Sequence, residues 1–170
     1  MKSAEVLADA FGRVQEIVHS AVDGLSADDL GARLDGGANS IGWLVWHLTR
    51  VQDDHLADAA GEDQVWHSGG WAERFELPFS HEETGYGQTT EQVAQVGVGA
   101  DLLLGYYDAV HERTLRFIQG LDDDALDRVV DEAWSPPVTL GVRLISVIGD
   151  DLQHAGQAAF VRGSLERSKG

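Results

Sequence analysis

The sequence predicts an all-α protein, a four-helix bundle with a long irregular crossover segment between the second and third helices. Four stretches repeat apolar residues at helical spacing, and the segment between residues 61 and 89 lacks that spacing. No stretch alternates apolar and polar residues for long enough to indicate a convincing strand. Because 170 residues suit one hydrophobic core, we expect residues 1–170 to form a single domain.

The first two long helices are predicted from apolar stripes and capping residues. The first begins at a Ser3 cap and ends at Gly24. A short helical turn follows at "LSADDL", where Ser26 is a capping residue, before the glycine-rich "LDGGAN" connection. The second long helix begins at Asn39 or Ser40, carries "SIGWLVWHLTRVQDDHLADAA" and ends at residue 61.

The segment from Gly61 to about Thr89 is rich in aromatic residues despite its irregular pattern. Long segments without regular structure are uncommon in compact domains and often act as lids over functional sites. The alternative is an irregular segment whose aromatic side chains cover an exposed edge of the core. Both interpretations stay open at the level of sequence.

The third helix is predicted to run without a break from Thr89 or Thr90 to Gly120, a length of about 45 Å at 1.5 Å per residue. Three glycines inside it predict close helix contacts or a bend: Gly97, Gly99 and Gly105. The stretch "LDDDALDRVVDEAWSPP" reads as a connection with one helical stretch, its acidic cluster solvated. The final helix begins after Pro137, is capped by Thr139 and ends near Gly163.

Composition excludes several classes of function. The chain has no cysteine, so it can form no disulfide, zinc–thiolate site or protein thiol nucleophile, and any thiol chemistry needs a small-molecule thiol. Its formal net charge of −17 disfavours nucleic acid as a partner, because phosphate backbones are bound by clustered Lys and Arg. The N-terminus lacks a signal-peptide apolar region and no apolar run could span a bilayer, so we expect a cytoplasmic protein with no membrane partner.

Several common active-site motifs fail on spacing. His81-Glu82 and His111-Glu112 begin like a metalloprotease helix, but the second histidine is missing four residues after each. The glycines around Tyr86 and Val98 lack the third glycine and the preceding strand of a dinucleotide-binding site. No nucleophile elbow or Walker lysine is present.

The last helix carries an unusual run of polar residues, "GDDLQHAGQ". On a helical wheel, one side is polar (Arg143, Ser146, Asp150, His154 and Gln157) and the other apolar (Leu144, Ile148, Leu152, Ala155 and Ala159). Asp150 and His154 are four residues apart, so their side chains can converge on one ion at about 2.0 to 2.2 Å. A solvated polar face is the competing interpretation.

His47 on the second helix strengthens the metal interpretation. It lies one turn after Trp43 and one turn before Val51, a setting that indicates an inward-facing side chain. Taken alone, such a histidine is more often a hydrogen-bonded core residue than a ligand. An inward histidine on one helix and Asp-x-x-x-His on another nevertheless form the set of two histidines and one carboxylate that bundles use for metals.

The two polar helices resemble a known family. "NSIGWLVWHLTRVQDDH" and "VIGDDLQHAGQAAFVRG" resemble the signature helices of the DinB-like metal-binding superfamily. "GGWAERFELPF", "TGYGQTTEQVAQV" and "WSPPVTLGVRLISV" resemble its actinobacterial, mycothiol-dependent branch, which includes maleylpyruvate isomerase and the mycothiol S-transferases. The resemblance spans residues 25–163.

This resemblance implies a site and a chemistry. The family's three ligands of a divalent metal match His47, Asp150 and His154, although the middle ligand is His in the wider superfamily and Glu in the isomerase-like branch. Asp is one methylene shorter than Glu, so Asp151 could share metal binding with Asp150. The Asp151 side chain is, however, turned about 100° around the helix from that of Asp150, and we prefer Asp150 as the ligand. We expect zinc, with nickel or iron as alternatives, and mycothiol as cosubstrate.

The expected function is a metal-dependent thiol S-transferase or isomerase that acts on small electrophiles, with a role in detoxification. The alternatives are a metal-dependent hydrolase or oxygenase, another DinB-like stress protein, or a non-catalytic metal-binding module. Arg143 could receive an anionic group of the substrate or form an ordinary ion pair. Gln157 and Asp54 could fix the histidine tautomers. A homodimer is a further expectation.

Overall fold

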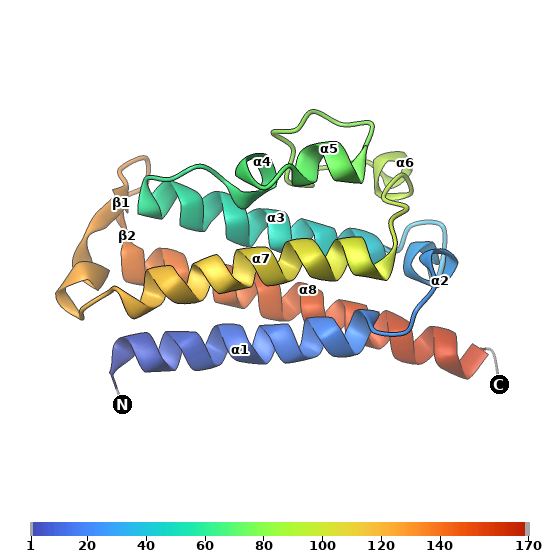
Figure 1. Ribbon diagram of the computed structural model, residues 1–170, viewed down its shortest axis with the longest axis horizontal. Helices are drawn as coiled ribbons and strands as arrows, with labels where there is room; N and C mark the ends of the chain where they lie inside the picture. Colours follow the sequence, from blue (N-terminus) through green and yellow to red (C-terminus); the bar gives the residue numbers. More distant parts are fainter. Residues whose placement is uncertain (1, 169–170) are drawn as a thin grey trace.

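Four long helices form the body of the molecule in the computed structural model, which describes residues 2–168 (Figure 1). They are α1 (Ser3–Val22), α3 (Ile41–Ala60), α7 (Ala100–Gln119) and α8 (Leu140–Ser168). Helices α1 and α3 each pack against both α7 and α8, so the four helices enclose a common core. The predicted all-α bundle is confirmed.

The direction of the helices explains the long crossover. In Figure 1, α3 and α7 run the same way along the bundle, so the chain must return along the bundle's length between them. The returning segment lies over α3 and α7 and contains α4 (Val65–Ser68), α5 (Trp71–Phe75) and α6 (Thr90–Val93). The predicted crossover segment is therefore present, with short helices inside it.

Capping residues set most helix ends where the sequence placed them. The Ser40 hydroxyl accepts a hydrogen bond from the Trp43 N–H (3.1 Å), and Gly61 ends α3 in the left-handed region with φ 69°. Ser26 caps the short helix α2 (Ala27–Gly31). The first helix begins at Ser3 itself, with Lys2 rather than Ser3 as its N-cap.

The predicted continuous third helix is wrong. It is divided into α6, capped by Thr89, and α7, which begins only at residue 100. In the break between them, Val96 and Val98 are buried in the core although they are not helical. Gly97 and Gly99 lower the helical preference of this break. Burial of the two valines in an irregular conformation outweighs the helical preference that remains. Gly105 does stay helical, and it lies against the Trp71 ring as the close contact predicted.

The connection before the last helix contains more structure than expected. A 3-10 helix, η1 (Asp124–Asp127), is followed by two short antiparallel strands, β1 (Val129–Asp131) and β2 (Val138–Thr139). Strands of three and two residues are too short to produce a recognisable alternation. The last helix also continues five residues past Gly163.

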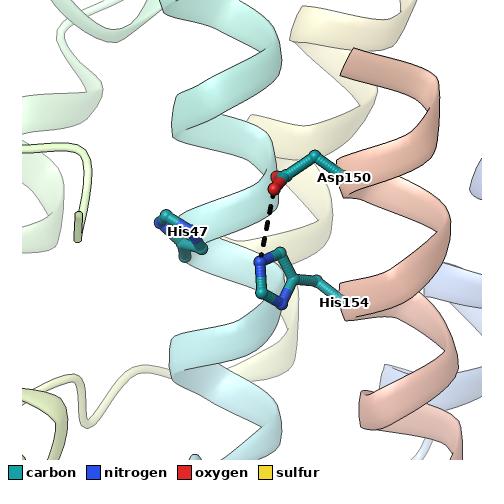
Figure 2. Close-up of side chains that lie close together, drawn as sticks. All are labelled: His47, Asp150 and His154. Atoms are coloured by element: carbon teal, nitrogen blue, oxygen red, sulfur yellow. Dashed lines mark ion pairs between the residues drawn. The ribbon is translucent and has the colours of Figure 1, made fainter. Parts of the chain in front are cut away.

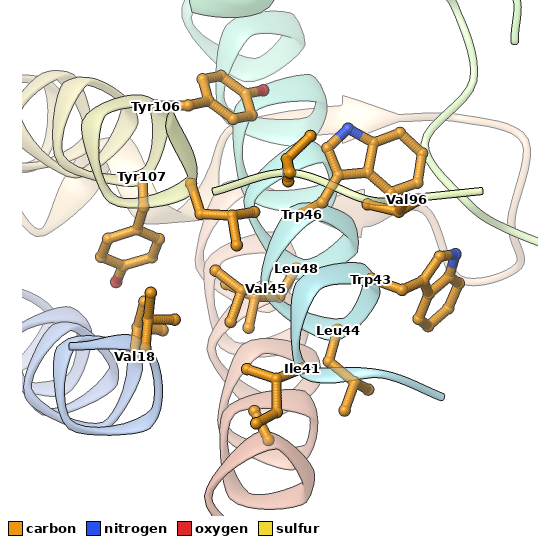
Figure 3. Packing of buried hydrophobic residues seen from close by; sticks show 14 of the residues in the cluster. Val18, Ile41, Trp43, Leu44, Val45, Trp46, Leu48, Val96, Tyr106 and Tyr107 are labelled. Atoms are coloured by element: carbon orange, nitrogen blue, oxygen red, sulfur yellow. The ribbon is translucent and has the colours of Figure 1, made fainter. Parts of the chain in front are cut away.

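The buried side chains form two clusters, and the larger one includes residues of the crossover (Figure 3). Trp66 and Phe75 of the crossover pack on the Tyr106 ring, with ring centroids 5.1 and 5.8 Å away. These aromatic residues therefore cover an edge of the core, whereas Tyr86 is 94% exposed. Within residues 2–168, no helix is both long and apolar enough to span a membrane.

Candidate metal centre

Three predicted ligands meet between α3 and α8. Asp150 and His154 extend from α8 toward α3, which carries His47 (Figure 2), and one potential ligand atom of each residue lies within 4.8 Å of the others. His47 is buried, and the other two side chains are partly buried. Among the residues that the structure describes, this is the one such group of three or more histidine and acidic side chains.

The helical step on α8 sets the geometry of the pair. Asp150 and His154 lie one turn apart on the face that meets α3, with Asp150 Oδ1 3.6 Å from His154 Nε2. The His47 ring stacks on Trp43 (centroids 4.6 Å apart, interplanar angle 18°) and lies 4.8 Å from the His154 ring. Trp43 therefore forms an apolar wall on one side of the three groups.

Each histidine is oriented by a hydrogen bond at Nδ1. His47 Nδ1 lies 2.5 Å from the Thr84 carbonyl oxygen, and His154 Nδ1 lies 3.1 Å from Gln157 Oε1. Since both partners are oxygens that accept, each ring donates from Nδ1, and a neutral ring then has its lone pair on Nε2. This is the arrangement in which metal-binding histidines are held by a second hydrogen bond.

Gln157 and Asp54 were both predicted to orient the histidines by hydrogen bonds. Gln157 makes such a bond to His154, and Asp54 does not make one to either histidine. Asp54 Oδ1 accepts a hydrogen bond from Gln64 Nε2 at 2.7 Å, and the Thr84 carbonyl takes the position beside His47. The sequence could not reveal the role of Thr84, because every residue has a main-chain carbonyl whatever its side chain.

Gly85 brings the crossover close enough to reach His47. Its φ of +98° lies in the region that favours glycine, and an added Cβ would stand 2.7 Å from His47 Nδ1 and 3.0 Å from Trp46 Cζ3. Any side chain at this position would push the crossover away from α3. The glycine-rich "TGYG" stretch thus carries a positional signal that only the tertiary structure reveals.

The electrostatics of the site favour a neutral imidazole beside a carboxylate. Burial lowers the pKa of His47 from its ordinary value, an effect that the Thr84 carbonyl opposes. Pairing with His154 lowers the pKa of Asp150, and pairing with Asp150 raises the pKa of His154. At neutral pH the site therefore presents an ionised carboxylate and at least one neutral ring nitrogen.

The donor set fits a divalent cation. Asp150 Oδ2 is shielded from solvent and has no hydrogen-bond partner within residues 2–168. An ionised oxygen without a partner is costly to bury, and a cation would satisfy it. Two imidazole nitrogens and one carboxylate suit zinc and other first-row metals, with further coordination positions left for a ligand. That these residues bind a metal stays a prediction.

Asp151 lies outside this group. It is completely buried, and neither carboxylate oxygen has a partner in the part of the chain that the structure describes. Burial raises the pKa of Asp151 well above its ordinary value, and burial, followed by the proximity of Asp151, raises the pKa of Tyr107 in α7. The neighbouring Leu152, predicted on the apolar side of α8, is instead 38% exposed. Ala159 is exposed as well, because Asp151 and Ala158 take the inward positions.

Arg143 is engaged in an ion pair two turns before Asp150. Its Nη2 donates to Asp131 Oδ2 of β1 at 2.7 Å, and its Nη1 lies 3.3 Å from His55 Nδ1. The guanidinium thereby ties the strand pair to α8 and α3. A contact with the substrate stays a prediction for this residue.

The fold and the cluster first define a class: helical bundles in which imidazole and carboxylate side chains from facing helices converge. The chain belongs to the mycothiol S-transferase family, whose model matches residues 6–167. This result confirms the resemblance to DinB-like proteins. A solved structure described as the conserved protein of locus from Enterococcus faecalis is 29% identical, with a TM-score of 0.89 over 95% of this chain and 96% of that chain. No curated protein sequence matches the chain.

Proposed function

We propose that the chain is a divalent-metal-dependent S-transferase that joins a small thiol, mycothiol, to an electrophilic substrate in the cytoplasm. The observation that carries this proposal is the convergence of His47, Asp150 and His154, with one potential ligand atom of each within 4.8 Å of the others and with an Asp150 oxygen that lacks a partner in the described chain. Membership of the mycothiol S-transferase family supports mycothiol as the thiol. Zinc is the metal that we expect first, because two imidazoles and one carboxylate with open positions are typical of its catalytic sites.

The bound ion would hold the thiol as its thiolate, which is the nucleophilic form. The chain itself supplies no sulfur nucleophile, because it contains no cysteine. In the transfer, the thiol S–H bond breaks and its proton passes to solvent. A sulfur–carbon bond forms with the electrophile, and the leaving group departs with the electrons of its former bond. An electrophile that adds rather than substitutes takes up that proton instead.

The residues of the chain hold this reaction in place. The Thr84 carbonyl and Gln157 orient the two imidazoles, so their Nε2 atoms face the same point. Trp43 covers one side of the group and limits access of water there. Such orientation matters because a small displacement of reacting groups lowers the rate steeply.

Metal analysis of protein purified without a histidine tag tests the first half of the proposal. We expect about one divalent ion per chain and its loss in His47→Ala, because two ligands hold the ion far less well than three. His67→Ala is the matched control, since His67 lies on α4 against Glu82, outside the cluster. Equal metal content in wild type and His47→Ala would disprove the site.

Conjugation of mycothiol tests the second half. Metal-loaded protein should form thioether products with small electrophiles, whereas His47→Ala should not exceed the uncatalysed rate. A hydrolase would instead release hydrolysed substrate without consuming the thiol. Stoichiometric metal with neither product would leave a non-catalytic metal-binding module.

A further inference from the structure

A groove of about 670 Å³ lies along α8 beside the metal centre. Its walls come from α8, from α3 and from the connection between α2 and α3. Apolar side chains dominate the lining, among them Leu34, Leu44, Leu152 and Phe160. Phe160 is 65% exposed, so the groove presents a large apolar surface to solvent. A volume of this size is typical of small-molecule sites.

The groove carries no charge, although the protein as a whole is strongly acidic. Its polar lining side chains are the amides of Asn39, Gln153 and Gln157. A second hollow, of about 360 Å³, is lined by five Asp and Glu residues: Asp54, Asp58, Glu62, Asp63 and Glu82. The groove is uncharged although the chain has a net charge of −17. Its lining therefore favours an uncharged ligand over a charged one.

Gln157 joins the groove to the metal centre. Its side chain lines the groove, and its Oε1 is the partner of His154 Nδ1. Leu44, on the opposite wall, directly follows Trp43, whose ring stacks on His47. A molecule in the groove would therefore lie against both residues that border the ligand histidines.

We propose that this groove holds the electrophilic substrate, and that the substrate is an uncharged, largely apolar molecule with a polar group for the lining amides. This inference rests on the S-transferase function proposed above. It adds the substrate class: an anionic electrophile would lose its hydration in a groove that offers no cation in return. An apolar ring would bury its surface against Leu44, Leu152 and Phe160.

A second copy of the chain is a poorer occupant. Between Val142 and Phe160, the exposed positions of α8 are uncharged, and they form a strip about 28 Å long and one helix wide, roughly 300 Å². A standard protein interface needs about 800 Å² from each partner. The hollow shape also suits a compact ligand better than a flat contact between helices.

Two matched fluorescent probes test the groove without any reaction. N-phenyl-1-naphthylamine is uncharged, and 8-anilinonaphthalene-1-sulfonate adds a sulfonate to the same ring system. We expect the neutral probe to bind the protein as purified about tenfold or more tighter than the sulfonate. Gly156→Leu should weaken the neutral probe about tenfold, because it fills the groove from α8.

Gly12→Leu on α1 is the control for Gly156→Leu. An added Cβ meets no atom within 4 Å at either glycine, so both variants should fold, and only one lies in the groove. Gln153→Lys should narrow the preference for the neutral probe by strengthening sulfonate binding. Equal affinity for the two probes, or unchanged binding in Gly156→Leu, would overturn the proposal. A wild-type dimer that Gly156→Leu converts to a monomer would assign the groove to a second copy instead.

Conjugation of mycothiol then links the groove to the reaction. 1-Chloro-2,4-dinitrobenzene and 4-chloro-3,5-dinitrobenzoate both lose chloride to a thiolate, and the second carries a carboxylate. We expect faster conjugation of the neutral compound and a higher KM for it in Gly156→Leu, with metal content unchanged. If Gly156→Leu conjugates mycothiol as fast as the wild type does, the groove does not bind the electrophile, while the S-transferase function stands. Probe binding without metal uptake or conjugation overturns the function, and with it the groove's role for an electrophile.

Discussion

Two polar clusters lie on α3, one turn apart, and they differ in how completely their atoms are paired. In the first, Asp53 accepts hydrogen bonds from the Val65 and Trp66 N–H groups and from the Tyr106 hydroxyl, at 2.7 to 2.8 Å. Arg50, 3.9 Å from Asp53, donates to Gln64 and to the carbonyls of residues 81 and 83. In the second, formed by His47, Asp150 and His154, Asp150 Oδ2 is shielded from solvent and has no partner among residues 2–168.

This difference distinguishes a structural cluster from a candidate ligand site. A buried charge is tolerated when every polar atom has a partner, and the Arg50 cluster meets that condition. The candidate metal centre also combines a carboxylate with nitrogen bases, but its Asp150 Oδ2 has no partner in the described chain. Neighbouring carbonyls of one crossover stretch serve both clusters, since residues 81 and 83 bond Arg50 and residue 84 bonds His47.

The largest expected effect is on the paired cluster. Asp53→Ala should lower the free energy of unfolding by about 3–5 kcal/mol, because it leaves the Arg50 charge and three donors buried without their partner. Urea denaturation measures this loss. Asp54→Ala, which removes one hydrogen bond to Gln64, should cost about 1 kcal/mol. Similar losses in the two variants would contradict the structural role of the cluster.

The next effect is on the open cluster. Gln157→Ala should weaken metal binding about 10–100-fold, since it frees the His154 ring, while thermal stability changes little. Competition with a chromogenic chelator measures the affinity. Gln153→Ala is the control, because Gln153 bonds the Gly149 carbonyl and not a ligand. Equal metal affinity in both variants would show that Gln157 does not orient the site.

A smaller effect separates backbone strain from contact in the crossover. Gly85→Ala and Gly87→Ala both place a side chain at positive φ (98° and 71°), which costs about 1–3 kcal/mol. Only at Gly85 does the new Cβ also meet His47 and Trp46. We expect similar losses of stability from strain and weaker metal affinity in Gly85→Ala alone. Unchanged affinity there would mean that the crossover does not position His47.

The smallest effect concerns a buried histidine that is unpaired but belongs to neither cluster. His111 Nδ1 has no partner within residues 2–168, and burial lowers the pKa of its ring. The unfolded chain then binds more protons, so the free energy of unfolding falls as pH drops below the unfolded value of about 6.5. His111→Gln should make that fall shallower between pH 7 and 5 in urea titrations. An unchanged slope would contradict the effect of burial.

The sequence was sufficient where a feature repeats or lies close along the chain. Helical spacing located the four long helices, and the four-residue step placed Asp150 beside His154. It failed between α6 and α7, because Val96 and Val98 are buried by an irregular segment where one continuous helix was predicted. It also failed at Asp151 and Leu152, since a wheel ranks residues by polarity and cannot foresee an inward carboxyl group beside an outward leucine.

The partner of His47 is a main-chain atom, and this has a consequence for how the protein can change over generations. Substitution of Thr84 by another amino acid keeps a carbonyl oxygen at this position, so it should change the orientation of the His47 imidazole little. Insertions or deletions between α5 and α6 move the carbonyl itself. Loop length, rather than residue identity, is therefore the variable through which drift or engineering would retune this centre.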